Sequence, residues 1–144
     1  MPIRVKIKDR SFTSAINQLK NRAENRRPLM ESLSGIMHDA VEENFEQEGR
    51  PAWQDLKQKT KDARARKNKW PGKILQVSGQ LVNSIQSQAT ENEAVVFTNK
   101  EYAAAHQFGY EKNNLPARPF LSIPDETIEE MRDEVISFLT KGFL

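Results

Sequence analysis

The chain has 144 residues, of which 37% are hydrophobic and 29% charged, and none is cysteine. This composition is too apolar for a disordered chain, and the length suits one domain around a single core. Without cysteine the chain has no disulfide bonds or thiolate metal ligands, which favours a reducing, cytoplasmic location. No apolar run approaches the ~18 residues of a membrane span, and the first residues lack the apolar centre of a signal peptide. We therefore expect a single-domain cytoplasmic protein without membrane contacts.

Charge is distributed unevenly along the chain. Residues 1–73 carry 17 Lys or Arg against 10 Asp or Glu, and residues 74–144 carry 5 against 10. The two halves therefore have net charges of +7 and −5, which together give the overall +2. Such polarity can orient a subunit against a neighbour or against nucleic acid. The alternative is that the helices simply expose charged faces to solvent.

The first part of the chain has three regular patterns. The alternation of Ile3, Val5 and Ile7 with basic residues predicts a strand. Ser11 is placed to cap a helix whose apolar positions are Phe12, Ala15, Ile16, Leu19 and Ala23. A second, long helix has a proline in its first turn, at residue 28, and a glycine just past its end, at residue 49. Its apolar stripe consists of Leu29, Leu33, Ile36, Met37, Ala40, Val41 and Phe45.

A basic segment follows Trp53 and Leu56, two apolar residues that we expect to anchor it to the core. Its basic residues are Lys57, Lys59, Lys61, Arg64, Arg66, Lys67 and Lys69. Because few of its side chains could face a core, we expect an isolated helix or a mobile arm over residues 57–73, ended by Trp70-Pro71-Gly72.

The cations of residues 57–69 are candidates for contact with DNA or with an acidic partner. Lysine and arginine neutralise phosphates without contacting bases, so the DNA contact would be non-specific. No aromatic residue lies between Trp53 and Trp70, which argues against base stacking along the segment. The alternative is an exposed helix that binds nothing.

The second half contains shorter elements. Ser78-Gly79-Gln80-Leu81 predicts a cap and a short helix. Two β-type stretches, residues 85–90 and 94–98, flank Glu91-Asn92-Glu93 and predict a hairpin. Residues 101–108 predict a helix closed by a glycine.

A last strand is predicted over residues 120–123, followed by a helix that Pro124-Asp125-Glu126 opens. The inward residues of this C-terminal helix are expected to be Ile128, Met131, Val135, Phe138 and Leu139. The elements together predict an α+β fold, in which a small, mostly antiparallel sheet packs with three to four helices, including the long second helix and the C-terminal helix. We expect one domain over residues 1–144.

The sequence has no motif that indicates catalysis. His38 and His106 are far apart, and neither belongs to a zinc-binding pattern. Phosphate-binding loops and nucleophile elbows are absent. The acidic residues of the C-terminal helix are Asp125, Glu126, Glu129, Glu130, Asp133 and Glu134. Paired carboxylates can hold magnesium in a nuclease, but here they lie on the polar side of an amphipathic helix. We expect no enzyme activity, no catalytic residue, no cofactor and no metal site.

Three local patterns occur in a fixed order. The first is Trp53-x-x-Leu56-x-x-x-Thr60, and the second is Ile74-Leu75-x-x-Ser78-Gly79-x-Leu81-x-x-Ser84-Ile85. The third is Tyr102-Ala103-x-x-His106-Gln107-Phe108-Gly109, followed by Pro116-Ala117-Arg118-Pro119-Phe120-Leu121. Over about residues 10 to 140 the chain resembles the virion-morphogenesis, or tail-completion, family of Mu-like and P2-like tailed phages.

The resemblance implies a structural protein that acts late in tail assembly, in the host cytoplasm and then at the tail end or neck of the virion. Such a protein completes or caps the tail and permits head–tail joining. The implied partners are the phage tail tube, the head and neck proteins, and further copies of the chain, in a homo-oligomeric ring that is sixfold in many related proteins. The alternative is a non-specific DNA-binding protein that acts through residues 57–69.

The third pattern supplies candidate contact residues. A glycine at 109 can end the helix with a positive φ, and the two prolines hold the following segment extended. Arg118 then has a fixed direction of exit, while Phe120 and Leu121 anchor the segment in the core. Tyr102, His106 and Phe108 are expected to pack beneath it. The candidates for oligomer or partner contact are Tyr102, His106, Pro116, Arg118 and Pro119. In a head-to-tail ring, the basic half of one subunit could meet the acidic half of the next.

Overall fold

A computed structural model describes residues 10–141, apart from the side chain of Phe12, so the strand predicted over residues 3–7 lies outside the described part. The elements are α1 (Arg10–Glu24), α2 (Arg27–Glu46), α3 (Gln58–Arg66), α4 (Gln80–Asn83), β1 (Gln86–Ala89), β2 (Ala94–Phe97), α5 (Ala103–Phe108), the 3-10 turn η1 (Glu111–Asn113) and α6 (Asp125–Thr140). The predicted α+β class is confirmed: helices dominate, with one small antiparallel sheet.

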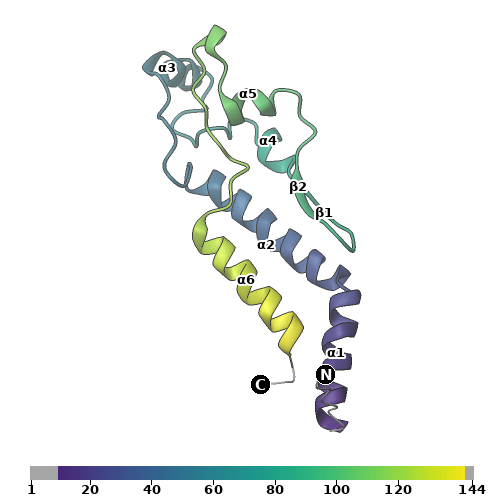
Figure 1. The fold of residues 1–144 in the computed structure, drawn as a ribbon. Coiled ribbons are helices and arrows are strands. Elements are labelled where there is room, and N and C mark those ends of the chain that lie inside the picture. Colours follow the sequence, from purple (N-terminus) through teal and green to yellow (C-terminus); the bar gives the residue numbers. More distant parts are fainter. Residues whose placement is uncertain (1–9, 142–144) are drawn as a thin grey trace, which may run out of the picture.

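The molecule is elongated and has two parts (Figure 1). The helices α1, α2 and α6 form a stem, and residues 47–123, with α3, α4, α5 and η1, form a head at the C-terminal end of α2. The hairpin of β1 and β2 extends from the head along α2, and both strands pack against that helix. In the stem, α6 packs along α2 and α1 packs against α6.

The long helix forms as its sequence predicts. Proline lies in its first turn, where a missing N–H costs no helical hydrogen bond. The buried apolar residues are Leu29, Leu33, Ala40, Val41 and Phe45, at helical spacing. Gly49 follows the helix with a φ of +100°, and a Cβ at this position would collide with the Trp53 indole. The turn therefore needs glycine, and it brings Trp53 against the end of α2.

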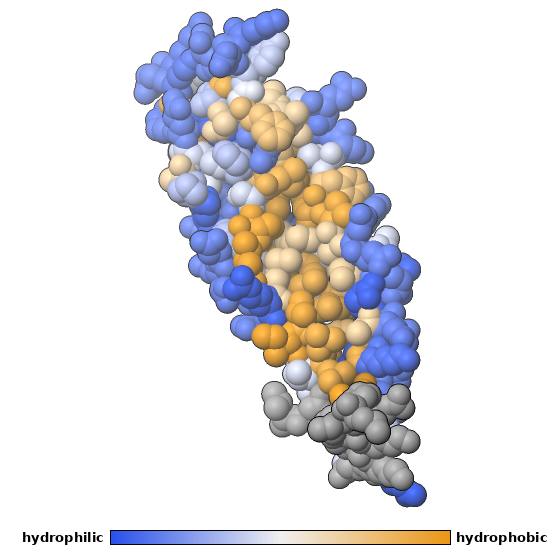
Figure 2. Space-filling model, in the orientation of Figure 1, coloured by the Kyte–Doolittle hydropathy of each residue, from blue (hydrophilic) through white to orange (hydrophobic). Residues whose placement is uncertain are grey.

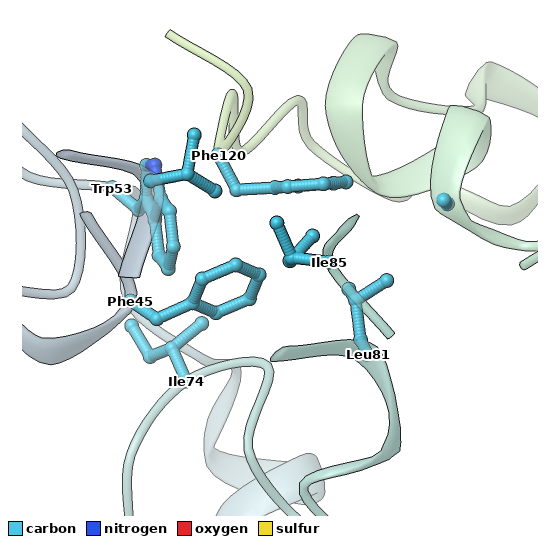
Figure 3. Packing of buried hydrophobic residues seen from close by; sticks show 8 residues of the cluster. Phe45, Trp53, Ile74, Leu81, Ile85 and Phe120 are labelled. Carbon is cyan, nitrogen blue, oxygen red and sulfur yellow. The ribbon is translucent and has the colours of Figure 1, made fainter. Parts of the chain in front are cut away.

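The main core lies where α2 meets the head (Figure 3). The Phe45 ring lies 5.8 Å from the Trp53 ring in an edge-on arrangement and 5.3 Å from the Phe120 ring. The same cluster contains Ile74, Leu81 and Ile85, together with Val41 and Ala103. All three sequence patterns thus contribute to one core, and Trp53 anchors the chain as predicted.

The predicted hairpin is confirmed, but the predicted strand over residues 120–123 is wrong. The pairs Gln86↔Phe97 and Ala89↔Ala94 set the register of β1 and β2, and within the described residues the sheet has no third strand. The chain bends at Leu121, and side chains rather than a neighbouring strand bind the backbone polar groups of Phe120, Leu121 and Ser122. A strand pattern in sequence cannot distinguish these two kinds of partner.

Two further predictions, on the cap of α1 and on the inward face of α6, differ from the structure of the stem. Ser11 lies inside α1 rather than at its cap, and Ile16 is 47% exposed. In α6, the residue buried against α2 is Thr127, while the adjacent Ile128 is 40% exposed. Successive residues point about 100° apart around a helix, so the apolar stripe of α6 is turned partly away from α2. Across residues 10–141, no helix combines the length and the apolar character needed to cross a membrane.

Candidate interaction site

The second part of the third sequence pattern lies in a segment without helix or strand, residues 116–122, which we call the strap. Gln107 on α5 holds its backbone: Gln107 Oε1 accepts hydrogen bonds from the amides of Phe120 at 3.0 Å and Leu121 at 2.9 Å. The Arg118 amide also donates to the His106 carbonyl at 2.7 Å. Side chain and backbone of α5 therefore replace the missing neighbouring strand.

The other edge of the strap is bound by the end of α2 and the loop after it. Asn44 Nδ2 donates to the carbonyls of Phe120 at 2.9 Å and Ser122 at 2.8 Å, and Trp53 Nε1 donates to the Pro119 carbonyl at 3.0 Å. Asn44 is fully buried, and its Oδ1 accepts a hydrogen bond from Arg50 Nε at 2.9 Å. The bond from Trp53 to Pro119 joins the first sequence pattern to the third, which explains why the two patterns occur together.

Arg118 points into the subunit, which corrects the predicted outward direction. Its side chain is only 4% exposed; Nε donates to the Gln54 carbonyl at 2.9 Å and Nη2 to the Asp55 carbonyl at 3.2 Å. Burial lowers the pKa of the Arg118 guanidinium below its usual value, and the positive charge of Arg64 lowers it further. The two carbonyls thus satisfy a guanidinium that the fold largely removes from solvent. A contact between Arg118 and another subunit stays a prediction.

Gly109 is required where α5 meets the strap. Its φ is +79°, and a Cβ there would lie 2.9 Å from the Ala117 amide nitrogen and 3.0 Å from the Leu115 carbonyl oxygen. Only glycine permits both this conformation and this close approach. Much of the third pattern is therefore explained by folding.

The other predicted contact residues lie in or near the strap and differ in solvent exposure. Tyr102 and Pro119 are exposed, and Pro116 is half-buried. The rings of Tyr102 and His106 meet edge-on at 6.0 Å. In the part of the chain that the structure describes, the buried Nδ1 of His106 has no hydrogen-bond partner. Burial lowers the pKa of His106, and the charge of Arg118 adds to this, so the imidazole is neutral at pH 7.

Phe108 was expected in the core, but it is 79% exposed. Its neighbour Gln107 faces the strap, and the 100° turn between adjacent residues directs the Phe108 ring outward. The ring lies at the edge of an open hollow of about 520 Å³ that Ala103, Ala104 and Leu121 also line. A large exposed aromatic ring beside an apolar hollow is typical of a contact surface.

The basic segment forms the helix α3, which has no buried residue. Three cations are held within the head. Lys61 forms an ion pair with Asp55 at 2.7 Å and lies over the Trp70 ring, while Arg64 and Lys57 donate to backbone carbonyls. The Lys61 hydrogen bond is the main cause that lowers the pKa of Asp55.

The remaining cations of the basic segment are exposed, and within residues 10–141 they have no hydrogen-bonding or ion-pair partner: Lys59, Arg66, Lys67 and Lys69. This end of the head is therefore a surface of positive charge that could neutralise an anionic partner. Whether the segment moves stays a prediction.

Acidic side chains gather elsewhere, in a groove between α2 and α6. The groove has a volume of about 340 Å³, and its charged lining consists of Asp39, Glu43, Arg50, Glu126 and Glu130. Arg50 pairs with Glu126 at 3.1 Å. The net charges of the two halves of the chain did not predict this groove, because α2, which supplies two of its acidic residues, lies in the half that is basic overall. The acidic polar face of α2 was the available signal.

The features brought together here are surfaces: a basic end at α3, an acidic groove between α2 and α6, and exposed apolar residues. Across residues 10–141, no three His, Asp or Glu side chains are arranged to hold a metal ion. Figure 2 shows an apolar strip that runs along the molecule between α6 and α2. The separated basic and acidic surfaces and the exposed apolar residues suit binding to other macromolecules.

Comparison with known proteins agrees with this description. The model of the phage virion morphogenesis family matches residues 7–140. The chain is also 38% identical over 129 residues to the "Mu-like prophage FluMu G protein 2" of Haemophilus influenzae strain Rd, with 86% of each chain covered. No solved structure matches. The match spans all the elements of the stem and the head, and the protein belongs to the phage virion morphogenesis family.

Proposed function

We propose that this protein is a structural subunit that completes the phage tail and thereby permits the tail to join the head. The observation that carries the proposal is the family match over residues 7–140, together with the three patterns that define the resemblance. The described fold supports it, because those patterns build a rigid strap and core rather than a reactive centre. The role is structural rather than catalytic.

The proposed partners are further copies of the chain, the tail tube and the head or neck proteins. The basic end at α3 and the acidic groove between α2 and α6 lie on different parts of an elongated subunit. A subunit with two complementary but separate surfaces suits head-to-tail contacts, which close into a ring when the rotation permits. The ring, with six subunits as one candidate number, assembles in the host cytoplasm and then belongs to the virion.

The test is electron microscopy of particles from an induced prophage with a stop codon at Gln18, with a plasmid copy of the gene as the control. DNA-filled heads beside unjoined or abnormally long tails, restored to joined virions by the plasmid, are expected. Normal joined virions from the stop-codon prophage would contradict a tail-completion role.

A second candidate function is non-specific DNA binding through α3. It is favoured by the four exposed cations that have no partner in the described residues, Lys59, Arg66, Lys67 and Lys69. If these residues bind phosphates, duplex DNA shifts in a gel at low salt, and replacing all four by glutamine abolishes the shift and its salt dependence. A wild-type protein that leaves DNA unshifted at low salt would contradict this function.

A further inference from the structure

An apolar groove runs along α6 beside α2, and the residues that the structure describes leave it open. Its apolar lining is Leu33 of α2 with Ile128, Met131, Val135 and Ile136 of α6. Ile136 is 57% exposed and Ile128 40%. The charged lining residue, Arg132, is paired with Glu129 at 2.6 Å. An exposed apolar groove on an otherwise charged helix is typical of a contact surface.

The α1 helix has a matching exposed flank. Ala15 and Leu19 are half-buried, whereas Ile16 on the same apolar stripe is exposed. The two helices have similar lengths, 15 residues for α1 and 16 for α6, which correspond to about 22 and 24 Å. Within the subunit α1 contacts α6 near its C-terminal end, where Arg22 Nη1 donates to the Leu139 carbonyl at 3.2 Å. The groove at residues 128–136 and the exposed Ile16 remain open to a second copy.

The net charges of the two helices favour contact between α1 of one copy and α6 of another over contact between two α6 helices. Within residues 10–24, α1 has three basic residues and one acidic residue, so its net charge is +2. Within residues 125–140, α6 has six acidic residues and one basic residue, so its net charge is −5. Two α6 grooves facing each other would bring like charges together, whereas α1 against α6 combines apolar burial with opposite charges.

We infer that the occupant of the α6 groove is α1 of a second copy of this chain. The exposed flank of α1, with Ile16, lies on the groove between Ile128 and Ile136 of its neighbour. Each subunit then offers one helix and accepts another, so the contact is head-to-tail. The inference rests on the proposed function, because it adds a second contact between copies of the structural subunit, separate from the one between the basic end at α3 and the acidic groove.

The experiment uses the full chain in sedimentation-velocity runs at several concentrations. Ile136→Glu blocks the groove, and Ile16→Glu blocks the helix that enters it. Val95→Glu is the matched control, since Val95 on β2 is as exposed as Ile128 but lies outside the groove. Far-UV circular dichroism and thermal unfolding establish that each variant keeps the fold. We expect each of the two groove-contact substitutions to weaken self-association by about 30-fold or more, and the control to leave it unchanged.

Mixing the two variants identifies the occupant. The Ile136→Glu protein keeps an intact α1, and the Ile16→Glu protein keeps an intact groove. An equimolar mixture should therefore form a species of twice the subunit mass that neither variant forms alone. A mixture that stays monomeric, while the folded wild type associates, overturns the choice of α1. A wild type that remains monomeric at about 100 µM overturns the interface itself. Both outcomes are distinct from the particle morphology that tests the proposed function.

Discussion

Replacement of Asn44 by leucine should destabilise the protein strongly, because this side chain holds the strap to α2. Leucine keeps the volume and removes the hydrogen bonds. Asn44 donates to the carbonyls of Phe120 and Ser122 and accepts from Arg50. The Phe120 residue is fully buried, so its carbonyl loses a partner that water cannot replace, at a cost of about 1–3 kcal/mol.

The other bonds join Asn44 to the carbonyl and hydroxyl of Ser122 and to Arg50. Both residues are partly exposed, so water can reach their polar groups, and the bonds to each residue contribute about 1 kcal/mol. The expected loss in the free energy of unfolding is therefore about 3–5 kcal/mol, a large part of the 5–15 kcal/mol typical of a domain. Urea unfolding measures it as a lower midpoint with an unchanged slope. Asn99→Leu, at an exposed position, is the control. A loss below about 1 kcal/mol, or an equal loss in the control, would refute the role of Asn44.

The other predictions concern single residues. Gly109→Ala should lower the free energy of unfolding by about 1–3 kcal/mol, because the positive φ and the nearby backbone exclude a Cβ. Gly35→Ala should instead stabilise α2 by up to about 1 kcal/mol, because a Cβ at this position meets nothing within 4 Å. Equal effects of the two substitutions in urea unfolding would contradict this. The pKa of His106 is lowered in the fold, so the unfolded chain binds the proton first and the free energy of unfolding falls as the pH drops below 6.5. In His106→Gln this part of the fall should disappear. An unchanged pH dependence of stability in the variant would disprove the contribution of His106. Phe108→Ser should change stability by less than about 0.5 kcal/mol, whereas Phe120→Ala should cost about 3–5 kcal/mol; a large effect at Phe108 would place its ring in the core.

Local patterns predicted the elements well because their causes are local. The stripe of α2 follows from three- and four-residue spacing, and Pro28 lies in the first turn of the helix as expected. The hairpin follows from two β-type stretches around a polar turn. The α5 helix ends at Gly109, where the backbone needs a positive φ. In each case, a few neighbouring residues contain the whole physical reason.

The sequence missed features that depend on the partner of each side chain. Arg118 was expected to point outward, but the carbonyls of Gln54 and Asp55 bind it inside. Phe108 was expected in the core, but Gln107 takes the inward direction of α5. The acidic groove combines residues of α2 and α6 that are far apart in the chain. None of these choices follows from spacing or composition.

By itself, the sequence determined the helices, the hairpin, the α+β class and the three patterns that indicate the phage virion morphogenesis family. The tertiary structure alone decided the role of the strap and the surfaces that the subunit exposes. The physical reason is that buried backbone groups must find hydrogen-bond partners wherever the fold supplies them. For the Phe120 carbonyl that partner is Asn44, 76 positions away, and no local pattern indicates a contact at that separation.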